Sequence, residues 1–293
     1  MPITLSENFR AVFYAPFYAT SELRHYRDEG LDVRLVTSPA PGLATAGLLD
    51  GSIDVTWGGP MRVMKARDEP AGPPLVCFCE VARKDPFYLV GRPPDGGFKL
   101  ADLAELRFAS VAEVPTPWLC LQHDLREAGI DPSRLDRIAD RSMAQNLDAL
   151  SRGEIDVAQV FEPFAAAAIR QGAGQILHAA SSRGLTSYTT FLTTRANVGR
   201  LGAEFAAMSR AIGRTQSWIA ECDASEFAAV VAPYFPEVPR ADLVSALRGY
   251  KAAGLWDRDT RVTRDGFERL AASLRSGGFI SHMPEYHDCV AET

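Results

Sequence analysis

One eight-residue pattern, L-x-x-G-x-I-D-V, occurs at residues 48–55 and again at residues 150–157. Each copy is followed by an aromatic residue and a proline, Trp57 and Pro60 in the first and Phe161 and Pro163 in the second. In such a pattern, glycine ends a helix in the left-handed conformation, aspartate leads into a short buried strand, and proline opens the next helix. The repeat predicts two similar α/β halves, with a ligand at the facing carboxyl ends of their strands. A chance match is the alternative, since I-D-V is a common way to begin a strand.

Length and composition narrow the class of protein. A chain of 293 residues is long for one hydrophobic core and suits two lobes. The net charge of −6 and the lack of any Lys/Arg run argue against a nucleic-acid partner. No stretch approaches the ~20 apolar residues that cross a bilayer, so we do not expect a membrane-spanning protein. The five cysteines are odd in number and lack framework spacing, which argues against a disulfide scaffold.

Strand and helix patterns alternate along most of the chain, and this alternation predicts parallel sheets covered by helices. A turn-rich segment, 93–97, separates two runs of this kind, and a β-rich segment, 187–194, follows the second run. The rest of the chain reads as helices between 201 and 276 and an irregular tail from 279 to 293.

Four segments resemble, in the right order, motifs of one family: the ABC-transporter substrate-binding proteins for thiamine-pyrimidine precursors, taurine and alkanesulfonates. The segments are 18–33 (Y-A … E-G-L-D-V), 48–55 (L-x-x-G-x-x-D), 99–103 (K-L-A-D-L) and 162–166 (E-P-F-A-A). Each motif alone is weak, and their shared order gives the resemblance its weight.

This resemblance implies the type II periplasmic-binding-protein fold, an α/β fold of two lobes, each with a mostly parallel sheet flanked by helices. Two crossing strands form a hinge, and a small organic ligand is trapped as the lobes close. Lobe 1 would be discontinuous, comprising residues 1–90 plus 193–293, and lobe 2 would comprise residues 91–192. An ABC permease would be the membrane partner of an exported protein, and we expect a monomer.

The cellular location has two readings. The resemblance implies the periplasm or cell envelope, whereas the N-terminus shows no basic segment, apolar region or cleavage site. The chain is therefore expected to be either an exported protein whose leader is missing from this sequence or a cytoplasmic protein.

The predicted ligand site lies on the turns between each strand and the next helix, because free N–H groups and the helix dipole favour an anionic group there. Aromatic residues clustered at these turns would form a stacking slot for a flat ligand, although each could instead belong to its lobe's core. Arg62 could hold a ligand carboxylate in a bidentate fork or be a surface residue, and Arg10 is a weaker candidate of the same kind. The candidate ligand-binding residues are Asn8, Phe9, Arg10, Phe13, Tyr14, Ser38, Trp57, Gly58, Gly59, Arg62, Thr116, Trp118, Phe161, Glu162 and Tyr188.

Two features of these turns refine the prediction. By resemblance, Glu162 would accept hydrogen bonds from a ligand amine or amide, while the alternative is that it complements the N-terminus of its own helix. Residues 113–118 read E-V-P-T-P-W where the family has a glycine-rich or Ser/Thr-rich turn. The loss of hydroxyl donors makes a sulfonate or phosphate ligand less expected.

Some relatives on this fold are enzymes: a thiamine-pyrimidine synthase, a sulfinate desulfinase and a dihydroxyphthalate decarboxylase. The synthase needs a lysine and a histidine just after the third strand, but Lys65 is one turn too late and no histidine is present. The desulfinase needs a cysteine in the first cleft turn, which contains none. Cys120 and His123 could resemble an activated nucleophile, with a core cysteine as the alternative. We predict no catalytic residue, cofactor or metal site, and a cytosolic enzyme stays as the alternative.

Overall fold

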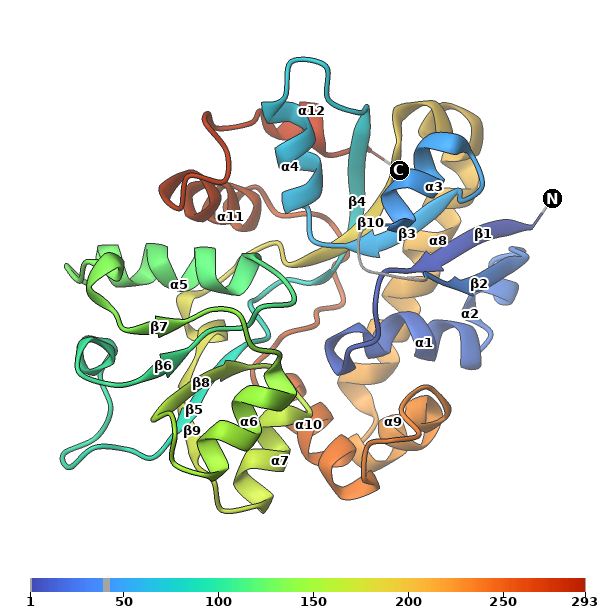
Figure 1. Cartoon of the computed structure of the whole chain (residues 1–293). Coiled ribbons are helices and arrows are strands. Elements are labelled where there is room, and N and C mark those ends of the chain that lie inside the picture. Colours follow the sequence, from blue (N-terminus) through green and yellow to red (C-terminus); the bar gives the residue numbers. More distant parts are fainter. Residues whose placement is uncertain (1, 39–42, 293) are drawn as a thin grey trace.

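The computed structural model describes residues 2–38 and 43–292 and contains two five-stranded sheets lying side by side (Figure 1). In the first sheet the strand order is β2-β1-β3-β10-β4. β1 is parallel to β2 and β3, and β10 is antiparallel to β3 and β4. The strand bounds are β1 (Ile3–Glu7), β2 (Val33–Thr37), β3 (Val55–Gly58), β4 (Leu75–Ala82) and β10 (Thr189–Thr194).

The second sheet has the order β7-β6-β8-β5-β9. β6 is parallel to β7 and β8, and β5 is antiparallel to β8 and β9. The strand bounds are β5 (Tyr88–Gly91), β6 (Phe108–Ala109), β7 (Arg137–Ile138), β8 (Val157–Val160) and β9 (Gln175–Ala179).

The chain passes between the sheets twice, once between Ala82 and Tyr88 and once between Ala179 and Thr189. Two sheets joined by two crossing segments confirm the predicted two-lobed α/β fold. The lobe limits proposed from the sequence, 1–90 plus 193–293 and 91–192, stay a prediction, and both crossings end a few residues before those limits.

Helices cover both sheets (Figure 1). The C-terminal helices pack on both lobes. α8 and α9 contact α1 of the first lobe, whereas α10 contacts α7 and α11 contacts α5 in the second. The helix bounds are α1 (Ala15–Glu22), α2 (His25–Asp28), α3 (Leu43–Asp50), α4 (Met61–Asp68), α5 (Thr116–Glu127), α6 (Met143–Ser151), α7 (Phe164–Arg170), α8 (Arg195–Glu221), α9 (Ala224–Val231), α10 (Arg240–Ala252), α11 (Arg264–Ser276) and α12 (Tyr286–Cys289).

The repeated pattern forms the same local structure in both lobes. Gly51 and Gly153 have φ of 81° and 71°, a region open to glycine without strain. The Asp54 carboxylate accepts the backbone N–H of Thr4 at 2.8 Å. The Asp156 carboxylate accepts the backbone N–H of Arg107, also at 2.8 Å. Each aspartate therefore fixes the start of the neighbouring strand, β1 in one lobe and β6 in the other.

The prolines after the pattern also behave alike, since Pro60 and Pro163 are the N-cap residues of α4 and α7. Residues 15–29 form two helices, α1 and α2, because Arg24 adopts a left-handed φ of 61° between them. The tail predicted to be irregular contains α12, and Val290 forms a parallel bridge with Cys77 of β4.

No helix within the described part of the chain is both long enough and apolar enough to cross a membrane.

Candidate functional site

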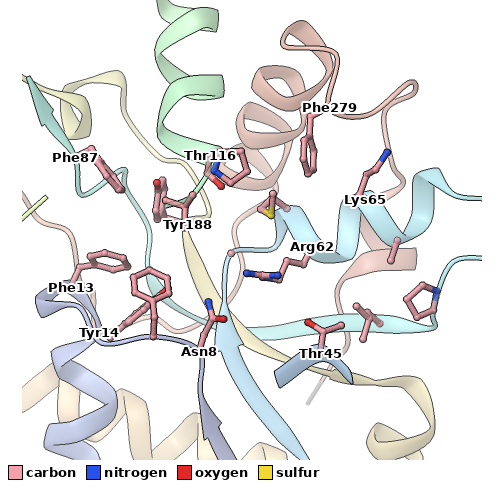
Figure 2. Close-up of a pocket in the computed structure, with 18 of the residues that line it drawn as sticks. Asn8, Phe13, Tyr14, Thr45, Arg62, Lys65, Phe87, Thr116, Tyr188 and Phe279 are labelled. Carbon is pink, nitrogen blue, oxygen red and sulfur yellow. The ribbon is translucent and has the colours of Figure 1, made fainter. Parts of the chain in front are cut away.

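A cavity of about 490 Å³ lies where the first sheet, the turn before α5 and the two crossing segments meet (Figure 2). This volume falls within the ~300–1,000 Å³ typical of small-molecule sites. Its lining comes from both lobes and from the segment after α11: Asn8, Phe9, Phe13, Tyr14, Thr45, Gly59, Met61, Arg62, Lys65, Ala66, Glu69, Pro73, Leu75, Phe87, Val114, Pro115, Thr116, Tyr188 and Phe279.

Polar groups reach the cavity from the ends of β1 and β3. Asn8 directly follows β1 and hydrogen-bonds the Tyr14 hydroxyl. Arg62 lies on the first turn of α4, a few residues after β3. A Cβ built on Gly58 would lie 3.6 Å from Asn8 Nδ2 and 4.0 Å from Arg62 Nε. Asn8 and Arg62 therefore both lie next to Gly58.

Arg62 supplies a positive charge to the cavity. Its guanidinium is half-buried and makes no hydrogen bond or ion pair with any of residues 2–38 and 43–292. Lys65, one turn further along α4, lies 3.8 Å from Asp68 and 4.0 Å from Glu69. Burial raises the pKa of Tyr14 despite the nearby Arg62 charge, so Tyr14 stays a neutral hydroxyl. An anionic ligand group would therefore find its partner at Arg62.

Aromatic side chains form the opposite end of the cavity (Figure 2). The rings of Phe13 and Tyr14 lie 4.3 Å apart, and the Phe13 and Tyr188 rings meet edge to face at 6.2 Å. Phe87, on the first crossing segment, lies 6.2 Å from Tyr188 on the second. This wall offers ring faces and edges to a flat ligand.

Phe161 lies behind this wall and joins the two lobes. Its ring is 5.4 Å from Phe13 of lobe 1 and 5.2 Å from Phe87 on the crossing segment. Phe161 itself does not line the cavity. The aromatic contact across the lobes therefore supports the wall from outside.

Eight of the residues predicted from the sequence lie on the cavity: Asn8, Phe9, Phe13, Tyr14, Gly59, Arg62, Thr116 and Tyr188. Gly58 is not part of the cavity lining and lies next to Asn8 and Arg62, which are. Whether these residues bind a ligand stays a prediction.

Three predicted residues lie elsewhere. Trp57 is fully buried in lobe 1, stacked on Phe17 at 4.4 Å, because it faces the core side of β3. Arg10 pairs with Glu7 at 3.2 Å and so points away from the cavity. Trp118 packs under the Arg137 guanidinium, whose carbon lies 4.3 Å from the ring centre.

Glu162 and Ser38 also lie off the cavity lining. The buried Glu162 carboxylate accepts the backbone N–H of Ala166 at 2.9 Å, so it complements the first turn of its own helix. Burial raises its pKa to about 7. Ser38 follows β2, and the remainder of its predicted turn, residues 39–42, lies outside the described residues.

Several lining residues were not predicted from the sequence. Val114 and Pro115 belong to the unusual turn before α5, whose composition was a usable signal. Phe87 lies on the first crossing segment, directly before β5. Phe279 comes from the C-terminal segment, where no sequence pattern indicated a return to the site.

The catalytic alternatives have little structural support. Cys120 is buried, and burial raises the pKa of its thiol, which disfavours the reactive thiolate. His123 faces Glu127, with Nε2 3.6 Å from the carboxylate. Among the described residues, no three His, Cys, Asp or Glu side chains gather in a way that could hold a metal ion.

Comparison with known proteins identifies the family. The sequence profile described as "ABC transporter, phosphonate, periplasmic substrate-binding protein" matches residues 21–215. The chain belongs to this family. The family match confirms the prediction of an ABC-transporter substrate-binding protein, and it makes a small ligand and an ABC permease the partners implied for its members.

Individual relatives agree with this assignment. YtlA of Bacillus subtilis (strain 168) is 22% identical over 285 residues, which cover 96% of this chain and 85% of YtlA. The periplasmic aliphatic sulphonate binding protein SsuA from Escherichia coli has a TM-score of 0.76 at 18% identity, covering 98% of this chain and 95% of SsuA. The nitrate-binding protein NrtA from Synechocystis PCC 6803 has a TM-score of 0.71 at 14% identity. The match covers 98% of this chain and 83% of NrtA. These structures share the fold of this family member, and their names specify different ligands.

Proposed function

We propose that this protein traps a small aromatic or heterocyclic organic anion between its two lobes and delivers it to an ABC-type uptake system. The observation that carries the proposal is the pairing, in one cavity, of an aromatic wall with the Arg62 guanidinium, which has no ion-pair partner in the described part of the chain. The aromatic wall would supply affinity through ring contacts, and Arg62 would fix the charged end of the ligand.

The arrangement of the lining supports capture by lobe closure. Asn8 and Arg62 come from lobe 1, Thr116 from the start of α5 in lobe 2, and Phe87 and Tyr188 from the two crossing segments. A ligand held by all three parts would be removed from water when the lobes close about the crossings. The family is periplasmic, and we propose export of this chain on that basis.

The proposal is tested by thermal-shift screening of the full chain against pyrimidines, aromatic acids and sulfonates, followed by calorimetric titration of each hit. A bound compound should be recovered unchanged by mass spectrometry, whereas a consumed compound would indicate an enzyme. If no compound of the panel binds, the proposed function is wrong.

Arg62→Ala should weaken binding of an anionic hit at least tenfold, because a charge-assisted hydrogen bond contributes about 1.5–3 kcal/mol and about 1.4 kcal/mol is tenfold in affinity. Arg248→Ala removes an exposed guanidinium of α10 that does not line the cavity and is the matched control. Equal affinity of the wild type and Arg62→Ala would reject the proposed cavity.

A further inference from the structure

The cavity also discriminates between classes of anion. We infer that the charged group of the ligand is a carboxylate carried on an aromatic ring, in preference to a sulfonate or a phosphonate. This inference rests on the proposed function and specifies which ligand that function serves. It also separates this chain from the phosphonate named in the description of its family.

The charge of the lining suits a monoanion. Its ionised side chains are two cations, Arg62 and Lys65, and one carboxylate, Glu69, which leaves one positive charge. Lys65 is already engaged by Glu69 and by Asp68 behind it. A phosphoryl group carries a charge of about −1.5 to −2 at pH 7. Its second charge would be buried without a partner, which is costly.

Backbone donors are reduced in number at the two helix starts that face the cavity. A tetrahedral oxyanion with three oxygens is commonly held by several N–H groups at a helix N-terminus. At α5, Pro115 is the N-cap and Pro117 the second helical residue, and proline has no N–H. At α4, Pro60 is the N-cap and the Arg62 N–H donates to the Gly59 carbonyl at 3.2 Å. Pro117 and the engaged Arg62 N–H thus take two first-turn donors away from a sulfonate or phosphonate.

A carboxylate needs fewer donors, and their geometry matches the side chain that is present. The guanidinium is a planar fork that binds the two oxygens of a carboxylate in parallel. The Arg62 guanidinium and the Asn8 amide both line the cavity and both lie close to Gly58, so a planar carboxylate held by Arg62 would lie beside the Asn8 amide. A methyl group on Gly58 would lie 3.3 Å from Leu192 Cδ1 and in van der Waals contact with both polar side chains.

The aromatic wall fixes what the carboxylate is attached to. Tyr14 contacts both the polar part and the aromatic part of the site. Its hydroxyl is hydrogen-bonded to Asn8, and its ring centre lies 4.3 Å from that of Phe13. Figure 2 shows Phe13, Phe87 and Tyr188 on one side of the cavity and Arg62 on the other. A carboxylate at Arg62 would therefore place its ring against the wall.

The test uses probes that share one ring and differ only in the anion: benzoate, benzenesulfonate and phenylphosphonate. Calorimetric titration of the full chain at pH 7.5 should show benzoate binding at least tenfold more tightly than the other two. In Arg62→Lys, which keeps the charge and loses the fork, this preference should fall below threefold. Arg248→Ala, a change in an exposed guanidinium of α10 that does not line the cavity, should retain the tenfold preference.

Three results would overturn the inference. Equal or tighter binding of benzenesulfonate or phenylphosphonate would reject the carboxylate and leave the proposed function standing. If none of the three binds while an uncharged or aliphatic compound of the wider panel does, the carboxylate is rejected together with the aromatic anion of the proposed function. A carboxylate preference that survives unchanged in Arg62→Lys would remove the role assigned to the guanidinium fork. By contrast, the absence of any binder in either panel would reject the proposed function itself.

Discussion

The two lobes share one folding pattern and differ in the turn that comes after it. In both, a left-handed glycine ends a helix, an aspartate holds the start of the neighbouring strand at 2.8 Å, and a proline caps the next helix. The residue before the proline is Gly59 in lobe 1 and Glu162 in lobe 2. Gly59 lines the cavity, whereas Glu162 is buried away from its lining.

This difference separates the requirements of folding from those of binding. The glycine, aspartate and proline have the same structural role in both lobes, so these residues say nothing about the identity of the ligand. The turns after the strands are free to differ, and here lobe 1 supplies the guanidinium and the amide. Lobe 2 supplies Val114, Pro115 and Thr116, which close the cavity from the other side.

The largest effect should come from the two aspartates of the repeat. Asp54→Ala should lower the free energy of unfolding by about 3 kcal/mol, and Asp156→Ala by about 1.5 kcal/mol, because hydrogen bonds to charged groups contribute about 1.5–3 kcal/mol and more when buried. The Asp54 side chain is 16% exposed and the Asp156 side chain 34%. Urea denaturation measures both, and an equal or larger loss in Asp156→Ala would show that burial does not set the difference.

A second prediction concerns Glu162, the charged counterpart of Gly59. Its pKa is raised from 4.5 to about 7 in the folded protein by burial, so its contribution to stability is full below pH 4.5 and is lost as pH rises to about 7. Glu162→Gln does not titrate. It should match the wild type at pH 4.5 and exceed it by about 2 kcal/mol at pH 8.

Thermal or urea unfolding across this pH range measures the Glu162 effect. The raised pKa values of Glu80 and Asp85 act in both proteins and cancel in the comparison. Glu237→Gln, at an exposed carboxylate that precedes α10, is the control and should leave the profile unchanged. A stability difference between wild type and Glu162→Gln that does not vary with pH would show that Glu162 is not the titrating group.

The smallest expected losses of stability come from the two glycines of the repeat, and these losses should be nearly equal in the two lobes. Gly51→Ala and Gly153→Ala should each lower the free energy of unfolding by about 1 kcal/mol, since both backbones are left-handed and an alanine there is strained. A Cβ at either position would meet nothing within 4 Å, so no packing change should distinguish them. Chemical denaturation should give two losses within error of each other. A difference of more than about 1 kcal/mol, the whole cost of one strained alanine, would show that the two copies of the pattern are not equivalent.

The fold could be predicted well from the sequence because its signals are local. The two glycines and two aspartates of the repeat act on the next turn or on an adjacent strand: Gly51, Gly153, Asp54 and Asp156. Such local relations can be recognised in a short sequence pattern. Arg62 was predicted for the same reason, since a residue on the first turn of α4 must lie near the end of β3.

The remaining site residues depend on distant parts of the chain. Trp57 was expected at the cavity, but a strand presents alternate residues to opposite faces, and Phe17 of α1 takes up its ring in the core. Arg10 was also expected at the cavity, but its guanidinium forms an ion pair with Glu7, three residues earlier in the sequence. Phe279 reaches the cavity only because α11 packs against α5 and α4, a contact that no local pattern records.

Whether the cavity between the lobes is the binding site is decided by a crystal structure of the protein with its tightest-binding compound. We expect density in this cavity, with the charged group on Arg62 and the ring against Phe13, Tyr14 and Tyr188. A ligand bound outside the cavity, or one that contacts a single lobe without Arg62, would show that the site lies elsewhere.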